Sequence, residues 1–240
     1  MVISASNLSK TVAVGESSEK LTILHDISLT ASAGEFLSIV GPSGSGKSTL
    51  LHCLSGLLRP TTGNVQILDV DPYHLSYSKA AAFRRNHIGF IFQSYNLIPA
   101  LPAYENIVLP LRLSRTPIDR HQIEQLLKKL NFNANPNNQV TDLSGGEQQK
   151  VAIARVLVAK SQIIFADEPT GALDSVSRQI IFNLLRELTN NGVCVIMVTH
   201  DIEMAAKTDK SLTLRDGHLE KILDHPNAET IFAALNTEKS

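Results

Sequence analysis

The sequence of 240 residues lacks the features by which a protein would itself span a membrane or bind nucleic acid. It has no apolar run near the roughly 18 residues needed to cross a bilayer, so any membrane role must come through another protein. It also has no long basic tract, and its formal net charge is −1, so composition gives no support to nucleic-acid binding. The opening MVISASNLSK lacks a basic segment followed by an uninterrupted apolar one, and we expect no signal peptide.

Cysteine is scarce, with only Cys53 and Cys194, and both lie in apolar runs. We interpret them as small buried side chains of a protein kept in a reducing compartment, and not as a disulfide or a metal site. The sequence has no internal repeat and no low-complexity block. With 43% hydrophobic and 19% charged residues, it is expected to form a soluble globular protein with one large domain or a core with lobes.

Four short apolar runs each end in polar residues. Because they are apolar throughout, they predict strands buried on both faces of a parallel sheet, where ligands bind at the carboxyl ends. Polar residues that merely end their strands are the alternative, which is weaker for four runs than for one. The runs are FLSIV (36–40) before Gly41, IGFIF (88–92) before Gln93, IIFA (163–166) before Asp167 and Glu168, and VCVIMV (193–198) before Thr199 and His200.

Helix and turn signals fill the intervals. Helices are expected over 48–58 and 145–160, and a third begins with Thr116 as N-cap, Pro117 at N1 and Asp119 at N3. Asp216-Gly217 indicates a hairpin, and residues 133–139 indicate a loop. We therefore predict a single α/β domain with a mostly parallel core. Its parts are an antiparallel β flank (1–34 and about 63–70), the core (about 35–93 and 159–222), a helical insert (about 94–158) and a C-terminal tail (223–240).

Residues 41–49, GPSGSGKST, match the phosphate-binding pattern G-x-x-x-x-G-K-[ST] between an expected strand and helix. This context predicts a P-loop NTPase (RecA-like) core, with a chance glycine- and serine-rich turn as the alternative. Lys47 should reach the β- and γ-phosphates, and Ser48 should offer its hydroxyl to Mg²⁺. The residues expected to bind the nucleotide are Gly41, Pro42, Ser43, Gly44, Ser45, Gly46, Lys47, Ser48, Thr49 and Gln93.

The polar residues at the other strand ends suit hydrolysis. Asp167 is a candidate Mg²⁺ partner, and Glu168 could accept a proton from the attacking water or orient it. Gln93 could hold the metal or the water, and His200 could donate a hydrogen bond to the γ-phosphate. The alternatives are a helix cap for the two carboxylates and ordinary exposed polar residues for the other two.

A second anion-binding pattern occurs at DLSGGEQQKV (142–151), where Ser144, Gly145 and Gly146 precede a helix. If Ser144 lies in the helical insert, it cannot easily reach the nucleotide held by its own chain. A head-to-tail two-fold dimer, in which each segment closes over the partner's nucleotide, resolves this. A plain N-capped helix with closely packed glycines is the alternative.

These motifs, in this order, resemble the nucleotide-binding subunit of an ABC (ATP-binding cassette) transporter over about residues 1–222. IGFIFQSYNLIPALPAYENIVLP and ADEPTGALDS are similar to the group that serves lipoprotein-releasing, macrolide-export and antimicrobial-peptide-resistance transporters, with the cell-division cassette as a relative. The resemblance implies a cytoplasmic ATPase held on the inner face of the cell membrane by a separate permease. It would drive export or extraction of a peptide, lipid-linked or drug-like substrate; the alternative is mechanotransmission without transport.

The resemblance also assigns roles to single residues. It implies ATP and Mg²⁺ as cofactors and Ser94–Asn106 as a groove for a permease helix. The residues concerned are Ser48, Gln93 and Asp167 for the metal, Glu168, His200 and Lys47 for catalysis, Ser144, Gly145, Gly146 and Glu147 as the signature acting across the dimer, and Asp174 as the dimer's D-loop carboxylate.

Two positions depart from the family pattern. The signature reads LSGGE where LSGGQ is commonest, and binding across the dimer is still expected because Ser144 and both glycines are present. Val12 stands where an aromatic residue usually stacks on adenine, so stacking should be weaker. A DNA-repair ATPase head is disfavoured, since the chain has no long coiled-coil insertion, no zinc-binding cysteine set and no basic stripe.

Overall fold

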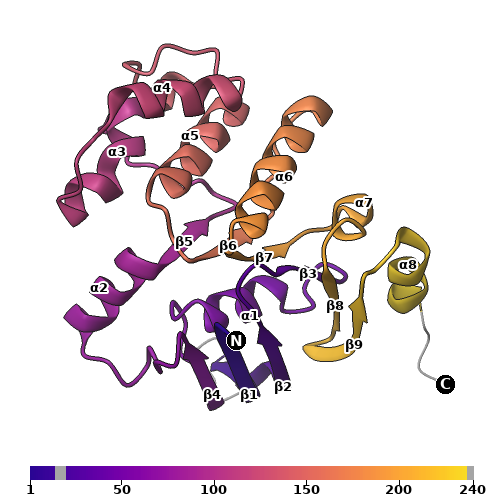
Figure 1. Cartoon of the computed structure of the whole chain (residues 1–240). Coiled ribbons are helices and arrows are strands. Elements are labelled where there is room, and N and C mark those ends of the chain that lie inside the picture. Colours follow the sequence, from indigo (N-terminus) through magenta and orange to yellow (C-terminus); the bar gives the residue numbers. More distant parts are fainter. Residues whose placement is uncertain (14–19, 237–240) are drawn as a thin grey trace.

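A six-stranded sheet carries the apolar runs. In this computed structural model, which describes residues 1–13 and 20–236, its order is β5-β6-β7-β3-β8-β9 (Figure 1). The strands from β5 to β8 pair in parallel, and β9 pairs antiparallel with β8. The α/β fold with a mostly parallel core is confirmed. The strand bounds are β3 (Phe36–Val40), β5 (Ile88–Ile91), β6 (Ile163–Asp167), β7 (Cys194–Val198), β8 (Lys210–Arg215) and β9 (His218–Asp224).

A second, antiparallel sheet has the order β2-β1-β4. Its central strand pairs on both sides at Ile3, opposite Ala31 on one side and Ile67 on the other. In Figure 1 it lies with helix α1 on one side of the larger sheet, away from helix α6. The bounds are β1 (Ile3–Ala13), β2 (Lys20–Ala31) and β4 (Thr62–Ile67).

Both faces of the sheet are buried at strands β3, β6 and β7, which explains why these strands are apolar almost throughout and do not alternate. In β6, Ile163 and Phe165 join the core formed with α1 and the smaller sheet. Ile164 and Ala166 point the other way, into the core that α5 and α6 cover. Successive side chains of a strand point to opposite faces of the sheet. A strand that contributes to a core on each face must therefore have apolar side chains at both the odd and the even positions.

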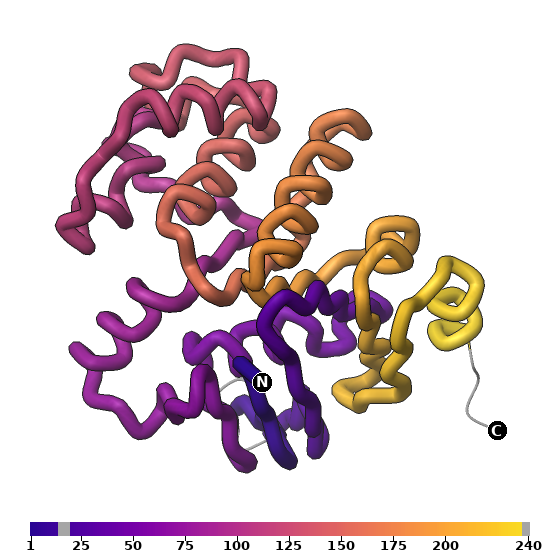
Figure 2. The backbone as a smooth tube through the Cα atoms, viewed as in Figure 1, coloured from indigo at the N-terminus to yellow at the C-terminus, as the bar shows by residue number. Residues whose placement is uncertain are grey.

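Helices α3, α4 and α5 gather at one end of the molecule, as both ribbon and tube show (Figures 1 and 2). They pack into the same core as α6 and strand β7. Among the described residues, no helix is long and apolar enough to cross a membrane. The helices are α1 (Lys47–Leu54), α2 (Tyr77–His87), α3 (Ala103–Ser114), α4 (Arg120–Lys129), α5 (Gly145–Val158), α6 (Ser175–Asn190), α7 (Ile202–Ala205) and α8 (Ala228–Asn236), with a 3₁₀ turn at Val140–Asp142.

The predicted start of α4 was wrong by one turn. Asp119, and not Thr116, is the N-cap, because its carboxylate accepts the backbone N–H groups of His121 and Gln122 at 2.9 and 3.2 Å. Helix α1 ends at Leu54, four residues before the predicted end. Helices α2, α6, α7 and α8 had no counterpart in the sequence-based prediction.

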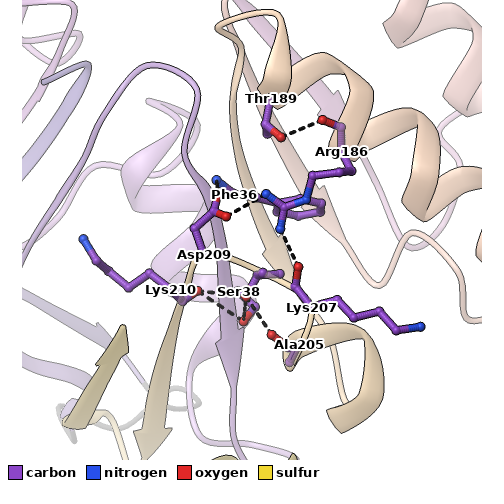
Figure 3. A network of polar contacts seen from close by, with 9 residues as sticks. Phe36, Ser38, Arg186, Thr189, Ala205, Lys207, Asp209 and Lys210 are labelled. Carbon is purple, nitrogen blue, oxygen red and sulfur yellow. Dashed lines mark hydrogen bonds and ion pairs between the residues drawn. The ribbon is translucent and has the colours of Figure 1, made fainter. Parts of the chain in front are cut away.

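A polar network fastens α6 to the larger sheet beside β3 (Figure 3). Arg186 donates to Asp209 Oδ1 at 2.7 Å and to the carbonyl of Lys207, while its guanidinium lies 5.1 Å over the ring of Phe36. Asp209 Oδ2 accepts the backbone N–H of Phe36 at 2.8 Å. The start of β3, which leads into the phosphate-binding sequence, is therefore held by α6 and by the residue before β8.

Candidate functional site

The glycine-rich segment turns sharply from β3 into α1. Gly46 is the N-cap of α1 with φ 96°, a left-handed conformation that L side chains rarely adopt. A Cβ on Gly41 would lie 2.0 Å from the carbonyl oxygen of Leu214, so this position has no room for a side chain. A Cβ on Gly44, in contrast, would meet nothing within 4 Å. The loop thus leaves open space in front of the N-terminus of α1, where backbone N–H groups and the helix dipole favour an anion.

Lys47 lies at the first position of α1. Its Nζ donates to the carbonyl oxygens of Gly41 and Pro42 at 2.9 and 2.7 Å. Burial lowers the pKa of Lys47, and the charges of Glu168 and Asp167 partly oppose that shift. The ammonium group is therefore held over the open side of the loop by weak partners that a phosphate could replace.

Ser48 joins the loop to the end of β6. Its Oγ donates to Asp167 Oδ1 at 3.0 Å. Asp167 is only 5% exposed, so its charge lies in a site where solvent compensates little. A hydroxyl and a buried carboxylate at hydrogen-bond distance are oxygen ligands of the kind that Mg²⁺ prefers. Ser48 and Asp167 are therefore the residues whose chemistry suits Mg²⁺ at this position.

Glu168 and His200 face each other across the ends of β6 and β7. The Glu168 backbone has φ 49°, and its N–H donates to the carbonyl of Val198 at 3.0 Å, so the turn after β6 is tied to β7. His200 Nδ1 approaches Glu168 Oε2 to 2.8 Å, and the side chains are 75% and 14% exposed respectively. The approach is not aligned as a hydrogen bond, and Oε2 has no other partner among the described residues, so it can accept from a bound water.

One cleft of about 560 Å³ brings most of these side chains together. Four of its lining residues, Tyr95, Gln149, Gly171 and Ala172, were not predicted for the nucleotide site. Tyr95 stands two positions after Gln93, and Gln149 follows the signature by two, so proximity to a motif was the available signal. The lining consists of Gly41, Ser43, Lys47, Gln93, Tyr95, Gln149, Glu168, Gly171, Ala172 and His200.

The signature residues Ser144–Glu147 are not among the described residues that line this cleft. Ser144 is the N-cap of α5 and accepts the N–H of Glu147 at 3.3 Å. The Glu147 side chain turns away to Lys150, with Oε1 and Nζ 2.8 Å apart. The first turn of α5 therefore keeps the unpaired N–H groups common to helix starts, without a carboxylate directed at them.

Several other predicted residues are also absent from the described lining of the cleft: Pro42, Gly44, Ser45, Gly46, Ser48, Thr49, Asp167, Asp174 and Val12. Asp174 caps α6: its carboxylate accepts the backbone N–H of Ser177 at 2.9 Å and its hydroxyl at 2.8 Å. These two bonds lower the pKa of Asp174. Val12 lies near the end of β1 opposite Leu21. Neither residue is among the described lining of the cleft.

This fold and cleft are those of an ATP-binding cassette, and the chain belongs to the ABC transporter family, whose sequence pattern, described as "ABC transporter", matches residues 24–171. The expected resemblance is confirmed. Among solved structures, the ATP-binding cassette MJ0796 in a dimeric post-hydrolysis state bound to ADP and Pi has a TM-score of 0.87 and 39% identity, covering 94% of this chain and 99% of that one.

Curated relatives fall in the predicted group. The chain is 40% identical over 208 residues to the lipoprotein-releasing system ATP-binding protein LolD of Shewanella sp., covering 85% of this chain and 89% of LolD. It is equally similar over 220 residues to the uncharacterized ABC transporter ATP-binding protein YvrO of Bacillus subtilis, covering 91% and 95%. It is also 40% identical to the macrolide export ATP-binding/permease protein MacB of Bdellovibrio bacteriovorus, but spans only 34% of that protein's length.

Proposed function

We propose that this chain is the ATP-hydrolysing subunit of a membrane transporter, that two copies bind two ATP molecules between them, and that the dimer drives a separate permease. The observation that carries the proposal is the position of the two anion-binding helix starts. That of α1 borders the cleft beside Glu168 and His200, whereas that of α5 lies outside the lining of the same cleft. A second copy in head-to-tail orientation would bring an α5 start to each nucleotide.

The cleft is the proposed site of MgATP. The loop from Gly41 to Thr49 would hold the phosphates, with Lys47 exchanging its two carbonyl partners for phosphate oxygens. Ser48, Asp167 and Gln93 would hold Mg²⁺, which supplies positive charge that neutralises the β- and γ-phosphates. No cluster of three His, Cys, Asp or Glu is found in the described part of the chain.

Glu168 is the proposed base. Its Oε2 is buried and has an acceptor position available, so it can hold the attacking water and receive its proton. His200 stands beside it at 2.8 Å and would orient the carboxylate while reaching toward the γ-phosphate. The ADP- and Pi-bound state of the similar cassette supports hydrolysis as the reaction.

The permease is proposed to dock on the helical insert, which would place the chain on the inner face of the cell membrane. A hollow of about 230 Å³ is bordered by Ser94–Leu97 and Pro99 together with Val140, Thr141 and Gln148. A larger groove of about 540 Å³ lies between the C-terminal ends of α2, α3 and α5 and the start of α4. Its apolar lining by Leu111, Leu126 and Leu157 suits the apolar face of a helix. The names of the relatives favour export or extraction of lipid-linked or drug-like molecules.

Catalysis and dimerisation are tested by Glu168→Gln. The variant should bind ATP, lose turnover by about 10²–10⁴-fold as expected for loss of a general base, and accumulate as a dimer in light scattering. Turnover at the wild-type rate would remove Glu168 from this role. If light scattering detects only monomers in the presence of ATP, even with the permease supplied, the proposed dimer with ATP bound between its two copies is contradicted.

Docking is tested by reversing charge at the rim of the larger groove. Arg85→Glu with Lys160→Glu should abolish co-purification with the permease in mild detergent while basal ATPase activity stays at the wild-type level. Arg120→Glu is the matched control, because Arg120 is 72% exposed and lies outside the groove lining. Retained co-purification of the double variant would exclude this groove. Export measured in vesicles then separates transport from mechanotransmission.

A further inference from the structure

A small core, separate from the two large ones, lies where helices α7 and α8 meet the end of β3 (Figure 1). Its buried members are Val40 on β3, Ala205 on α7 and Ile231 on α8, which are 1%, 0% and 0% exposed. Helix α7 contacts both β3 and α8. We call this cluster the α8 core. The partly buried side chains around it are Ile202, Ala206, Leu223 and Leu235.

The α8 core joins the two chain segments between which the γ-phosphate is proposed to lie. Val40 directly precedes Gly41, the first residue of the phosphate-binding loop. Asp201, the N-cap of α7, directly follows His200. No residue of α8 is among the described lining of the nucleotide cleft, so any influence of α8 on the reaction must pass through these two segments.

The phosphate-binding loop has several supports besides α8. Strand β3, which leads into it, pairs with β7 on one side and β8 on the other. The carbonyl of Ser45 accepts the backbone N–H of Gly217 at 3.1 Å, and Lys47 Nζ donates to the carbonyl of Gly41 at 2.9 Å. The position of the loop therefore depends little on α8.

His200 has fewer supports. Its side chain is 75% exposed, so its place beside Glu168 is set mainly by the backbone on either side. Before it, the N–H of Thr199 donates to the carbonyl of Ile39 at 3.2 Å, which ties this side to β3. After it, Asp201 begins α7 and accepts the N–H of Met204 at 3.1 Å. The second side of His200 is thus only as fixed as α7.

Helix α7 is a single turn of four residues, and so short a helix has little stability of its own. The ion pair of Asp201 with Arg178 is long, at 3.7 Å, and Arg178 is 40% exposed, so this contact is weak. Burial of Ala205 against β3 and α8 is a stronger constraint, because it removes apolar surface from water.

Helix α8 is itself fastened at both ends. At its start, the side chain of Asn227 accepts the N–H of Thr230 at 2.8 Å, and its carbonyl accepts the N–H of Ile231 at 3.1 Å. At its end, the carbonyl of Leu235 accepts from the guanidinium of Arg215 on β8. Helix α8 can therefore serve as a fixed surface against which α7 packs.

We propose that Ile231 positions His200 for ATP hydrolysis by holding α7 in place. The proposal deepens the proposed function and rests on the role given there to His200. When the contact of Ile231 with α7 is loosened, α7 shifts, and the imidazole leaves its place 2.8 Å from Glu168 Oε2. The γ-phosphate then loses the hydrogen bond proposed for His200, while the phosphate-binding loop stays where it is. Ile231 acts through Ala205 and is a positioning residue.

The test compares turnover in chains with and without His200. Ile231→Ala removes most of the apolar contact, and Ile231→Val removes one methyl group. Phe232→Ala is the matched control, because Phe232 occupies the next position of the same helix and is 60% exposed. Each change is made in the wild-type chain and in His200→Ala. Steady-state ATPase assays give kcat and KM, fluorescent-ATP titration gives the affinity, and circular dichroism at the assay temperature establishes that each variant is folded.

Ile231→Ala should lower kcat by about tenfold and leave KM and ATP affinity within about twofold, since a misplacement of about 1 Å can cost up to about 10²-fold in rate. Ile231→Val should lower kcat by about threefold, because it leaves a smaller gap. Phe232→Ala should match the wild type. His200→Ala should itself lower kcat by about 10²-fold, as expected for loss of one donor to developing charge. In that chain, Ile231→Ala should cause no further loss, whereas a merely structural role would lower kcat by the same factor in both chains.

A folded Ile231→Ala variant with the wild-type kcat, or with an equal loss in the His200→Ala chain, overturns the positioning and leaves the proposed function intact. If Ile231→Ala does not fold, Ile231→Val decides by the same comparison. A loss of kcat confined to the chain that has His200 supports the proposal, and an unchanged kcat or an equal loss in both chains overturns it. If His200→Ala hydrolyses ATP at the wild-type rate, the role proposed for His200 fails, and the positioning by Ile231 fails with it.

Discussion

Changing Glu147 to glutamine would give this chain the commoner signature LSGGQ, yet the structure predicts that the change is destabilising. Glu147 Oε1 accepts from Lys150 Nζ at 2.8 Å, and Oε2 accepts the backbone N–H of Asn133 at 3.3 Å. Lys150 also donates to the carbonyl of Asn131 at 2.7 Å. The Lys150 and Glu147 side chains are 7% and 16% exposed. The carboxylate therefore neutralises a buried ammonium group that ties α5 to the end of α4.

The expected magnitude follows from this burial. Removing one partner of a buried ion pair costs about 3–5 kcal/mol, because the remaining charge is left without compensation. Glu147→Ala should approach that value. Glutamine retains an amide oxygen that can accept from Lys150, so Glu147→Gln should cost only about 1–2 kcal/mol. For a chain of this size, 1 kcal/mol corresponds to about 2–4 °C, which gives a lowering of the melting temperature by about 2–8 °C.

Circular dichroism during heating measures the change, with and without ATP. Lys150→Met, alone and combined with Glu147→Gln, completes a double-mutant cycle, and the combined variant should regain part of the loss since neither charge remains. Glu124→Gln, which removes an exposed partner of Arg120, is the control and should change stability by no more than about 0.5 kcal/mol. A Glu147→Gln variant that melts at or above the wild-type temperature would refute the role given to the pair.

Three further predictions concern the site and its support. Ser48→Ala removes the hydroxyl 3.0 Å from Asp167 and should weaken Mg²⁺-dependent ATP binding by about tenfold in calorimetry, with smaller loss in EDTA. Asp174→Asn should lower urea stability at pH 7 more than at pH 3, because a lowered pKa adds stability above the ordinary value of 3.8 that disappears as pH falls through the folded value. Asp209→Asn leaves Arg186 without its carboxylate and should cost about 1–3 kcal/mol in thermal unfolding.

The sequence predicted best where burial leaves a continuous pattern. The run FLSIV coincides with β3, Phe36–Val40, because a strand between two cores is buried at every position, and its one polar residue, Ser38, is buried with its hydroxyl 3.0 Å from Thr208 Oγ1. The start of α4 was placed wrongly because Thr116 and Asp119 are both good N-caps, and Pro117 favoured the earlier one. Helix α2 was missed since none of its residues is buried, so it has no apolar periodicity to recognise.

The site was predicted to the extent that its residues belong to contiguous motifs. Lys47, Glu168 and His200 stand at strand ends of one parallel sheet, so the fold alone brings them to one cleft. The contacts that connect the cleft to α5 were not predictable in this way. Arg155 bonds to residues about 60 positions earlier, and those bonds go to backbone carbonyls, which every residue has. A motif identifies the groups that meet a ligand, whereas their mutual support depends on packing between distant segments.

The contrast between the two helix starts is consistent with the proposed dimer, in which one start of each kind would meet at each nucleotide. At α1, the ammonium of Lys47 is held only by carbonyls of its own loop, among the described residues, which leaves its charge available to a phosphate in the cleft. At α5, Ser144 caps its own helix, and the nearest carboxylate is neutralised by Lys150, so the start of the helix stays favourable to an anion from outside the chain. In the proposed dimer, a γ-phosphate held between one start of each kind would lose the donors of α5 if the copies separated, and loss of that phosphate would remove the attraction. We therefore infer that binding closes the dimer and hydrolysis opens it.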